Sequence, residues 1–205
     1  MDKPKIQFDT ARLYVRSVEE SDKEAYMNLR VETSDIALAY QIHPGFRDCE
    51  WNGELNSQKD IFLAAFLKEN DMMIASASFQ NYESDCIELG FDVTEQYRNQ
   101  GFATELVQGM LEMFNVLFSG KTASIKTNVT NSACRRVAEK CGGVFSGYEP
   151  TMAVMAMETL LESYGNKPID DKELLAIRIK SAEFIEKNKE GVCVYVFRAD
   201  HNSTK

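Results

Sequence analysis

Several short segments of the chain predict strands, some because hydrophobic and polar positions alternate with a period of two and others because they are short runs of apolar, β-prone residues. These segments are Ile6–Arg16, Ile61–Leu67, Met72–Tyr82, Cys86–Val93, Ala123–Val129, Val144–Tyr148 and Val192–Arg198. Polar turns at 69–71 and 83–85 join the second, third and fourth of them. Because these connections are short, the three strands are expected to form an antiparallel meander.

Other segments place apolar residues at helical spacing. They predict helices that begin near Ser21, Gly101, Asn131, Met152 and Asp170. Two of these starts, Ser21 with Glu24 and Asp170 with Glu173, have the spacing of a capping box.

The stretch from Val31 to Gln58 is patterned less regularly. It predicts a second short helix, followed by a loop that carries Pro44, Gly45 and Gly53. The order of strands and helices is that of a mixed α/β domain. We therefore predict that the 205 residues form a single domain, with 151–190 as a helical insertion before the last strand.

The charged residues sum to a net charge of −9. This balance argues against a general nucleic-acid-binding protein, because phosphate neutralisation needs clustered Lys and Arg. Apolar runs such as Ile61–Leu67 are far shorter than the ~20 residues of a membrane span, and the N-terminus lacks an apolar signal segment. Five cysteines without C-x-x-C spacing indicate reduced thiols. A cytoplasmic protein with no nucleic-acid or membrane partner is expected.

Several kinds of site can be set aside. The two histidines, His43 and His201, accompany no carboxylate or cysteine cluster of ligand spacing, so no metal is expected. Gly120–Thr122 resembles the end of a phosphate-binding P-loop, but it joins a helix to a strand instead of a strand to a helix. Gly143–Gly147 is one residue out of register for the nucleophile elbow of a serine hydrolase.

The most informative segment is Cys86–Glu105, in which a strand, a polar loop and a helix follow one another. At the helix start near Gly101, unpaired backbone N–H groups lie at the positive end of the helix dipole and form an anion site. Gly101 and Ala103 let the backbone approach a phosphate closely, and Arg98 adds a positive charge. Taken alone, the segment is equally compatible with an ordinary strand–loop–helix corner.

Arg98-Asn-Gln-Gly-Phe-Ala103 resembles the R/Q-x-x-G-x-G/A pyrophosphate loop of the GNAT superfamily of acetyl-CoA-dependent N-acetyltransferases. Two further segments resemble its ribosomal-protein-alanine N-acetyltransferase branch. They are Thr10–Arg16, similar to T-x-R-L-x-L-R, and Asn131–Gly142, similar to N-x-A-S-x-R-V-x-x-K-x-G-F. The order of the strands also agrees with this family. The resemblance covers about Phe8–Tyr148 and the terminal strand.

The resemblance implies a mixed sheet, flanked by helices, in which the strand Cys86–Val93 splays from Ala123–Val129. The gap would receive the pantetheine arm of acetyl-CoA, and the following helix start would hold its pyrophosphate. The cofactor-binding residues that it implies are Phe91, Asp92, Val93, Arg98, Asn99, Gln100, Gly101, Phe102, Ala103, Thr104 and Asn131. Asn131 is equally suited to cap its own helix.

Acetyl transfer to a primary amine benefits from a general base, because an alkylamine is almost wholly protonated at neutral pH. Glu88 lies where several members of the family carry that base; the alternative is a strand glutamate that faces solvent. The acid for the leaving thiolate departs from the family pattern. Ala138 stands where many relatives have tyrosine, and Cys134 where this branch often has serine. Cys134 is the candidate acid; a role as buried filler, or replacement by Tyr148 or water, stays open.

The fold implies an acceptor site between segment 31–58 and the end of the sheet, with Tyr40, His43, Phe46 and Trp51 as candidate walls. The alternative for these four residues is that they pack their loop against the core. The insertion is expected to cover this cleft, to form a homodimer interface or to pack on the sheet. Together these features predict an N-acetyltransferase that moves acetyl from acetyl-CoA directly to a protein N-terminus or a small amine. The competing hypothesis is a non-catalytic acyl-CoA sensor or interaction module of the same fold.

Overall fold

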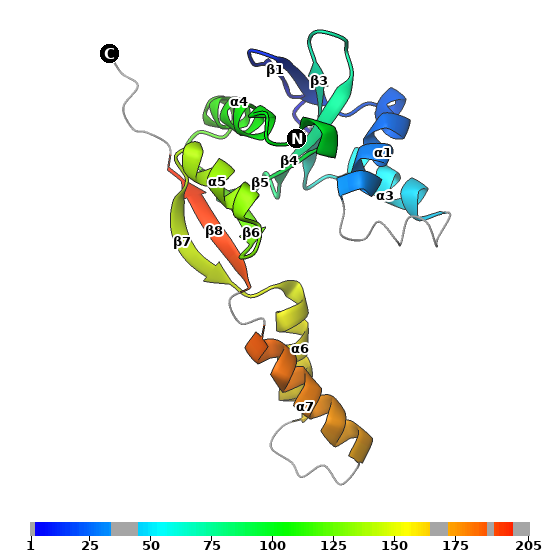
Figure 1. Ribbon diagram of the computed structural model, residues 1–205, viewed down its shortest axis with the longest axis vertical. Helices are drawn as coiled ribbons and strands as arrows, with labels where there is room; N and C mark the ends of the chain where they lie inside the picture. The colour runs from blue at the N-terminus through cyan, green and yellow to red at the C-terminus, as the bar shows by residue number, and fades with distance from the viewer. Residues whose placement is uncertain (1–2, 34–44, 165–171, 188–190, 199–205) are drawn as a thin grey trace.

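The computed structural model describes residues 3–33, 45–164, 172–187 and 191–198. Within these residues, eight strands form one sheet in the order β1-β2-β3-β4-β5-β6-β8-β7 (Figure 1). They are β1 (Gln7–Asp9), β2 (Leu13–Ser17), β3 (Ile61–Leu67), β4 (Met73–Gln80), β5 (Cys86–Val93), β6 (Thr122–Asn128), β7 (Val144–Glu149) and β8 (Val192–Phe197). Every neighbouring pair is antiparallel except β5 and β6. The predicted meander is β3-β4-β5.

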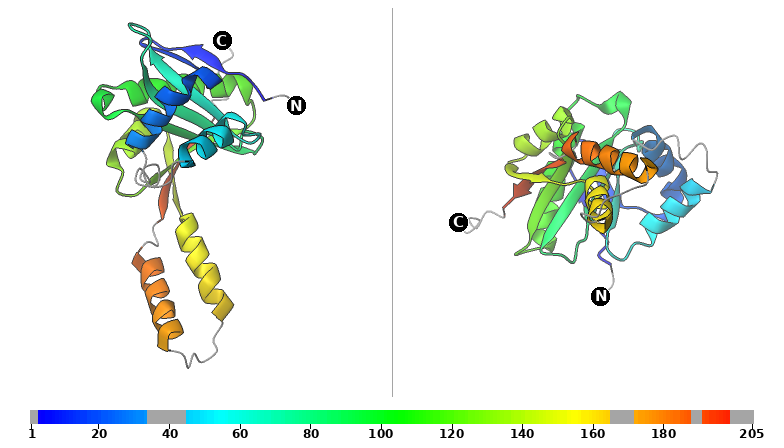
Figure 2. Two further views of the ribbon diagram at one scale, coloured as in Figure 1. Left: turned by 90° about the vertical axis from the view of Figure 1, so that its right-hand side faces the viewer. Right: turned by 90° about the horizontal axis from the view of Figure 1, so that it is seen from below.

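Helices cover both faces of the sheet (Figure 2). The helices are α1 (Lys23–Thr33), α3 (Phe46–Leu55), α4 (Phe102–Leu117), α5 (Ser132–Lys140), α6 (Met152–Tyr164) and α7 (Lys172–Lys187), with 3-10 turns at Glu20–Asp22 and Glu95–Tyr97. α1 and α3 share a small core on one face, while α4 packs on the main core of the other. The predicted class, a mixed α/β sheet flanked by helices, is confirmed.

Helices α6 and α7 form a hairpin that projects away from the sheet, which we call the arm (Figures 1 and 2). It leaves the sheet after β7 and returns into β8, at the place in the chain where the sequence predicts a helical insertion. In the part of the chain that the structure describes, no helix combines the length and the apolar character that a bilayer crossing needs.

The main core lies between the sheet and α4. The residues that α4 buries there share one face at helical spacing. They are Phe102, Leu106, Val107, Met110 and Phe114. Gly109 lies on the same side, and a Cβ at this position would be only 2.6 Å from the Phe8 ring of β1. The glycine therefore lets α4 sit close to the sheet, which holds the start of α4 beside the end of β5.

Strands β5 and β6 part in the middle of the sheet. Their parallel pairing joins only Cys86–Glu88 of β5 to Thr122–Ser124 of β6. β5 continues to Val93 and β6 to Asn128 beyond that pairing. This confirms the predicted splayed strand pair. The separation opens a gap in which an extended ligand can form hydrogen bonds with the strand backbone.

The first predicted strand, Ile6–Arg16, is wrong because β1 and β2 are separate strands of a hairpin. The chain turns at Thr10, whose N–H donates to the Leu13 carbonyl and whose hydroxyl donates to Glu105 of α4. The apolar positions shift from Ile6 and Phe8 to Leu13 and Val15, so the alternation slips by one residue at this turn, and that slip is the signal of the turn in the sequence.

The predicted capping box at Ser21 and Glu24 is also wrong, although the helix that follows is present. The box joins Glu19 and Asp22 instead, two residues earlier. Asp22 is held there by two hydrogen bonds from the Arg16 guanidinium, at 2.6 and 2.8 Å. A contact with β2 therefore decides between two local cap signals.

Two further local predictions have different outcomes. Gly53, predicted to lie in a loop, is inside α3. Pro44 of the same predicted loop and Asp170 of the second capping box lie outside the described residues.

Candidate active site

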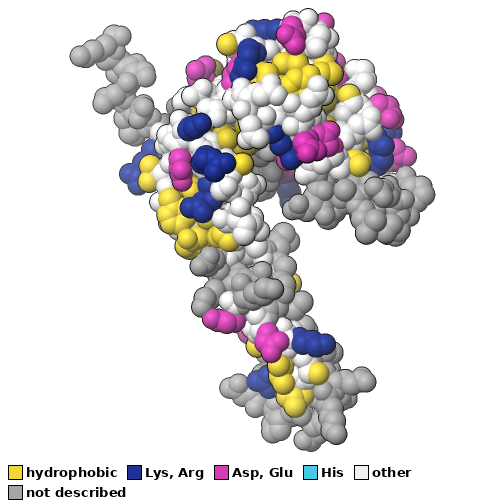
Figure 3. All heavy atoms as spheres, in the orientation of Figure 1, with side chains coloured by type: hydrophobic (Ala, Val, Ile, Leu, Met, Phe, Trp, Pro, Cys, Tyr) yellow, Lys and Arg dark blue, Asp and Glu magenta, His cyan; other side chains and the backbone are white. Residues whose placement is uncertain are grey.

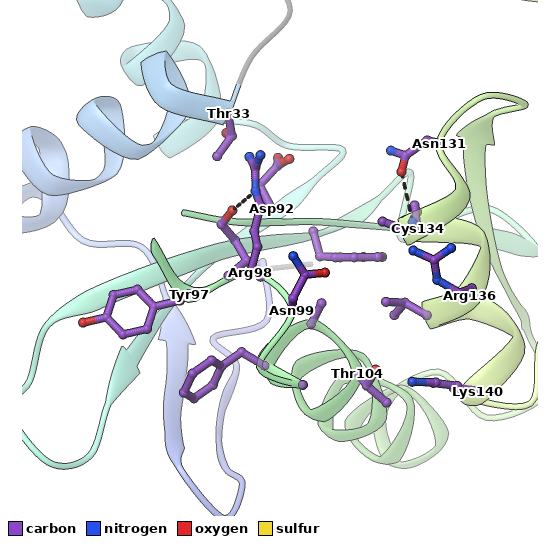
Figure 4. Close-up of a pocket in the computed structure, with 17 residues that line it drawn as sticks. Thr33, Asp92, Tyr97, Arg98, Asn99, Thr104, Asn131, Cys134, Arg136 and Lys140 are labelled. Atoms are coloured by element: carbon purple, nitrogen blue, oxygen red, sulfur yellow. Dashed lines mark hydrogen bonds between the residues drawn. The ribbon is translucent and has the colours of Figure 1, made fainter. Parts of the chain in front are cut away.

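A cavity of about 540 Å³ opens at the end of the sheet where β5 and β6 part (Figure 4). Its lining comes from the end of β5 that is no longer paired with β6, the loop that follows, the first turn of α4 and one face of α5. The volume lies in the range of sites that bind small molecules and cofactors.

The loop between β5 and α4 is shaped to receive an anion. Asn99 and Gly101 have left-handed backbone conformations, with φ of 60° and 86°, and Gln100 between them does not. A backbone that alternates between left-handed and other conformations turns successive N–H groups toward one point, and the first turn of α4 adds its own N–H groups. Asparagine and glycine adopt this conformation at the least cost. The geometry fits the anion site that the sequence predicts.

Cationic side chains surround the cavity although the whole chain is acidic. Arg98, Arg136 and Lys140 line it, against the carboxylate of Asp92. Arg136 and Lys140 lie one turn apart on α5, and Figure 3 shows Lys and Arg side chains gathered over this helix. In a chain of net charge −9, this local excess of positive charge favours a polyanionic ligand such as a diphosphate.

Arg98 ties the loop back to β5. Its Nε donates to the Val93 carbonyl oxygen at 2.9 Å. The Thr94 N–H donates to the Ile74 carbonyl next to β4, so the backbone groups of Val93, and by alternation those of Phe91, face away from β4 into the gap. An extended ligand in the gap can therefore form hydrogen bonds with the backbone of Phe91.

A network on the outer side of the loop fixes its position. Arg12 Nε lies 2.6 Å from Glu105 Oε2, its NH1 donates to the Gln100 carbonyl at 3.1 Å, and its guanidinium lies 3.8 Å from the Phe102 ring centroid. Thr10 donates to the same carboxylate at 2.6 Å. Burial acts to raise the pKa of Glu105, but the hydrogen bonds outweigh it and hold that pKa below its ordinary value. This part of the N-terminal motif thereby fixes the start of α4.

Helix α5 presents Asn131 and Cys134 to the cavity. The Asn131 side-chain oxygen accepts from the Cys134 N–H at 3.0 Å, so Asn131 caps its helix and also lines the cavity. Burial raises the pKa of the Cys134 thiol, and its hydrogen bond with Thr127 opposes this in part. The thiol is therefore protonated at neutral pH, which is the form that a proton donor needs.

Glu88 lies at the residue where the pairing of β5 with β6 ends. Its neighbours Ile87 and Leu89 belong to the main core beneath α4, so Glu88 faces the opposite side of the sheet. Lys126 Nζ lies 3.7 Å from its Oε2. Burial raises the pKa of Glu88, with Lys126 acting against it. A raised pKa suits a carboxylate that accepts a proton near neutral pH.

The sheet face that carries Glu88 is kept open by Gly90. A Cβ at Gly90 would lie 2.6 Å from Ser78 Oγ and 3.0 Å from Gln80 Nε2. Any larger residue would displace these polar groups of β4. The glycine therefore leaves the backbone of β5 accessible from the side of Glu88.

An ion cluster joins α1, α3 and β5 at the edge of the cavity. The Arg30 guanidinium lies 3.2 Å from Glu50 Oε1, 3.5 Å from Glu54 Oε1 and 3.3 Å from Asp92 Oδ2. Burial opposes the charge on Arg30, but the neighbouring carboxylates outweigh it and raise the pKa of the guanidinium. The side chain of Glu54 is only 10% exposed, and burial raises its pKa in spite of Arg30. Arg30 thus fixes Asp92, a lining residue, to two helices.

Most of the predicted site residues line the cavity. They are Phe91, Asp92, Val93, Arg98, Asn99, Gly101, Phe102, Ala103, Thr104, Asn131 and Cys134. Gln100 does not, because its side chain donates to the Gln96 carbonyl at 2.8 Å. Glu88 is not a lining residue either. The structure therefore brings the predicted cofactor residues together and places the candidate base at the fork of the two strands.

The cavity also contains cationic residues that the sequence analysis does not single out, Arg136 and Lys140. With Ala133 and Val137 they form one face of α5, at spacing i, i+3, i+4 and i+7. That spacing is visible in the sequence and could have identified this face.

Two of the predicted acceptor walls have other roles. Trp51 is fully buried in the small core of α1 and α3, and Phe46 packs against the same core. Tyr40 and His43 lie outside the described residues.

Tyr148, the alternative acid, is 54% exposed and does not line the cavity. Among the residues whose positions are described, no three His, Cys, Asp or Glu side chains are placed to hold a metal ion.

The profile of the acetyltransferase (GNAT) domain matches residues 12–144, more than half of the chain. The chain belongs to the GNAT acetyltransferase family. The GNAT match begins just before β2 and ends at the start of β7, so it includes the cavity but not the arm. No curated protein sequence matches the chain.

Solved GNAT structures share the fold at low sequence identity. RimL, a ribosomal L7/L12 alpha-N-protein acetyltransferase solved with coenzyme A joined to a cysteine by a disulfide, is 14% identical, with a TM-score of 0.64 over 96% of this chain and 100% of its own. A GNAT acetyltransferase from Bacillus anthracis is 19% identical, with a TM-score of 0.59 over 93% and 96%. Spermidine N-acetyltransferase from Vibrio cholerae, solved with CoA and spermine, is 16% identical, with a TM-score of 0.55 over 67% and 84%.

Proposed function

We propose that this GNAT protein transfers the acetyl group of acetyl-CoA directly to the primary amine of a protein N-terminus or a small amine. The observation that carries the proposal is the cavity at the end of β5 that is not paired with β6. A loop with two left-handed residues, a helix start and three cationic side chains meet there. The substrates of similar structures support this acceptor class, because RimL acts on a protein α-amino group and the spermidine enzyme on a polyamine.

The residues present fit CoA by their chemistry. The N–H groups of the loop 98–104 and the Arg98 guanidinium suit a diphosphate, and the backbone of Phe91 suits the amides of a pantetheine arm. Arg136 and Lys140 suit further phosphate charge. Bound acetyl-CoA would supply an acetyl group activated as a thioester.

The roles of the protein side chains follow from their protonation. Glu88 of β5 would accept a proton from the ammonium form of the acceptor, so that the neutral nitrogen can bond to the acetyl carbon. As the carbon–sulfur bond breaks, Cys134 of α5 would donate its proton to the leaving sulfur, and the attacking nitrogen would pass its second proton through water to the Cys134 thiolate, which leaves a neutral amide and a restored thiol. Burial suits both roles, because it raises the pKa of the carboxyl and keeps the thiol protonated.

A thiol-release assay with acetyl-CoA tests the proposal. The panel of acceptors is peptides with free α-amino groups and polyamines, with N-terminally acetylated peptides as controls. We expect amine-dependent CoA release with at least one free amine and none with the blocked peptides. Binding of CoA without turnover of any amine would instead indicate the non-catalytic module.

Glu88→Gln is expected to lower kcat/KM about 100-fold at pH 7, because the variant cannot take the proton of the amine. The loss should shrink as the pH rises toward the pKa of the amine, since the acceptor then loses its proton to solvent. The measurement is kcat/KM from pH 6 to 10, with Glu112→Gln on the exposed side of α4 as the matched control. Equal rates of Glu88→Gln and wild type at every pH would remove Glu88 from the mechanism.

Cys134→Ala is expected to lower kcat about tenfold with little change in the KM for acetyl-CoA, since water can replace the thiol as a poorer proton donor. The control is Cys141→Ala, at the end of the same helix and outside the cavity lining. A kcat of Cys134→Ala equal to that of Cys141→Ala would assign Cys134 to packing alone.

A further inference from the structure

Lys126 of β6 lies between two carboxylates from different strands. Its Nζ is 2.7 Å from Glu149 Oε2 and 3.7 Å from Glu88 Oε2. The strand registers place all three side chains on the sheet face opposite α4. Lys126 and Glu88 are each about one-third exposed, so their charges interact more strongly than they would in water.

Glu149 stands at the root of the arm. It is the last residue of β7, and two residues later the Thr151 hydroxyl caps the start of α6 by accepting from the Val154 N–H at 3.2 Å. The chain returns from the arm at Gly191, where φ is 60°. A Cβ on Gly191 would lie 1.9 Å from the Glu149 carbonyl oxygen, so the outgoing and returning chains touch there. The position of Glu149 is therefore set by how the two ends of the arm meet.

We propose that Lys126 is a positioning residue shared between Glu88 and Glu149, through which the root of the arm sets the proton affinity of Glu88. The inference rests on the proposed function, in which Glu88 is the general base. While Glu149 holds the ammonium of Lys126, this ammonium lies farther from Glu88 and stabilises the charged form of Glu88 less. If Glu149 is neutralised or displaced, Lys126 turns toward Glu88 and stabilises its charged form.

Few titratable groups face Glu88 in the described part of the chain. Lys126 approaches from β6 and Glu149 from β7, Cys86 lies two residues away on the same face of β5, and the neutral Gln80 is its partner on β4. Burial raises the pKa of Glu88, Lys126 lowers it and Glu149 raises it. An opposite charge at such distances shifts a carboxyl pKa by about one unit or more. Whether the Lys126 ammonium lies nearer to Glu149 or to Glu88 therefore decides which fraction of Glu88 is ionised near neutral pH.

Two variants should move Glu88 in opposite directions. Glu149→Gln leaves Lys126 to Glu88 alone, so the pKa of Glu88 should fall by about one unit. Lys126→Met removes the cation and leaves two facing carboxylates, so the pKa of Glu88 should rise by about one unit. The matched control is Lys68→Met, which breaks an ion pair with Asp9 at the other end of the sheet and should leave Glu88 unchanged.

The direct measurement is the carboxyl ¹³C shift of Glu88 against pH, assigned with Glu88→Gln, alongside the pH profile of kcat/KM. We expect the carboxyl titration and the acid limb of the profile to move together. If the titration moves in opposite directions in the two variants while the profile stays fixed, the link from arm to Glu88 holds and the role of Glu88 as base fails. If Glu88 titrates alike in wild type and both variants, or moves in the same direction in both, the inference is overturned.

Gly191→Ala tests the arm root without changing any charge. The added Cβ must push the Glu149 backbone away, so we expect the same direction of change as in Glu149→Gln. Gly120→Ala, at a φ of 83° with no atom within 4 Å of the added Cβ, controls for backbone strain alone. A shift in the pKa of Glu88 that is equal in the two glycine variants would contradict a role for the arm root.

Discussion

Replacing Gly101 by valine is expected to raise the Kd for CoA about 300-fold. Gly101 has a φ of 86°, which costs a residue with a side chain about 1–2 kcal/mol, and a β-branched residue most of all. The valine variant can avoid part of this cost by changing φ at this residue, so that CoA binding must restore the left-handed conformation. Losing one amide–phosphate hydrogen bond adds about 1.5 kcal/mol, and each 1.4 kcal/mol is a factor of ten.

The matched control for this prediction is Gly120→Val. Gly120 has a φ of 83°, lies in the turn between α4 and β6, and does not line the cavity. Both variants should remain folded, and only Gly101→Val should lose CoA affinity by calorimetry. Wild-type affinity in Gly101→Val, or an equal loss in both variants, would show that the loop does not hold the ligand.

Arg30→Met is expected to reduce the free energy of unfolding by about 3–5 kcal/mol, because it leaves buried carboxylates without their cation. Glu54 and Glu50 are the most affected, with side chains only 10% and 18% exposed. For a chain of this size the loss corresponds to a fall in Tm of about 10 °C. It should exceed that of Arg47→Met, whose partner Glu24 is 85% exposed and whose ion pair contributes at most about 1 kcal/mol.

The pH dependence of this loss distinguishes uncompensated charge from lost packing. Burial raises the pKa of Glu54 even beside Arg30, so without this cation the pKa of Glu54 should lie still further above its unfolded value. A carboxyl with a raised folded pKa destabilises the protein above the unfolded pKa, and the penalty disappears as both states become protonated. The deficit of Arg30→Met should therefore shrink below about pH 4.5, near the unfolded pKa of glutamate. A deficit that is constant with pH would indicate lost packing instead.

The sequence predicted the elements whose limits are set by local pattern. Ile61–Leu67 and Cys86–Val93 match β3 and β5, because the first is a continuous apolar run, the second alternates along its whole length, and polar turns bound both. The errors occur where a distant contact decides the local structure. Thr10 turns the chain by binding Glu105, which lies 95 residues away, and Asp22 replaces Glu24 in the capping box because Arg16 holds it.

The candidate site also has a part that the local sequence predicts and a part that only packing of distant segments creates. The loop 98–104 could be predicted because its glycine and helix start carry the chemistry in consecutive residues. The ion cluster of Arg30 could not, because its members come from three elements that meet only after packing. For Trp51 the sequence leaves two roles open, an acceptor wall and core packing, and only its burial against α1 decides for the core.

The central claim is that the backbone amides between β5 and α4 hold the diphosphate of CoA. It is tested most directly by adding CoA, and separately pantetheine, to ¹⁵N-labelled protein and following the amide resonances. We expect that CoA shifts the amides of residues 98–104 together with Phe91, and that pantetheine leaves 98–104 nearly unchanged. Amides of 98–104 that stay in place at millimolar CoA, or shifts confined to another surface, would contradict it.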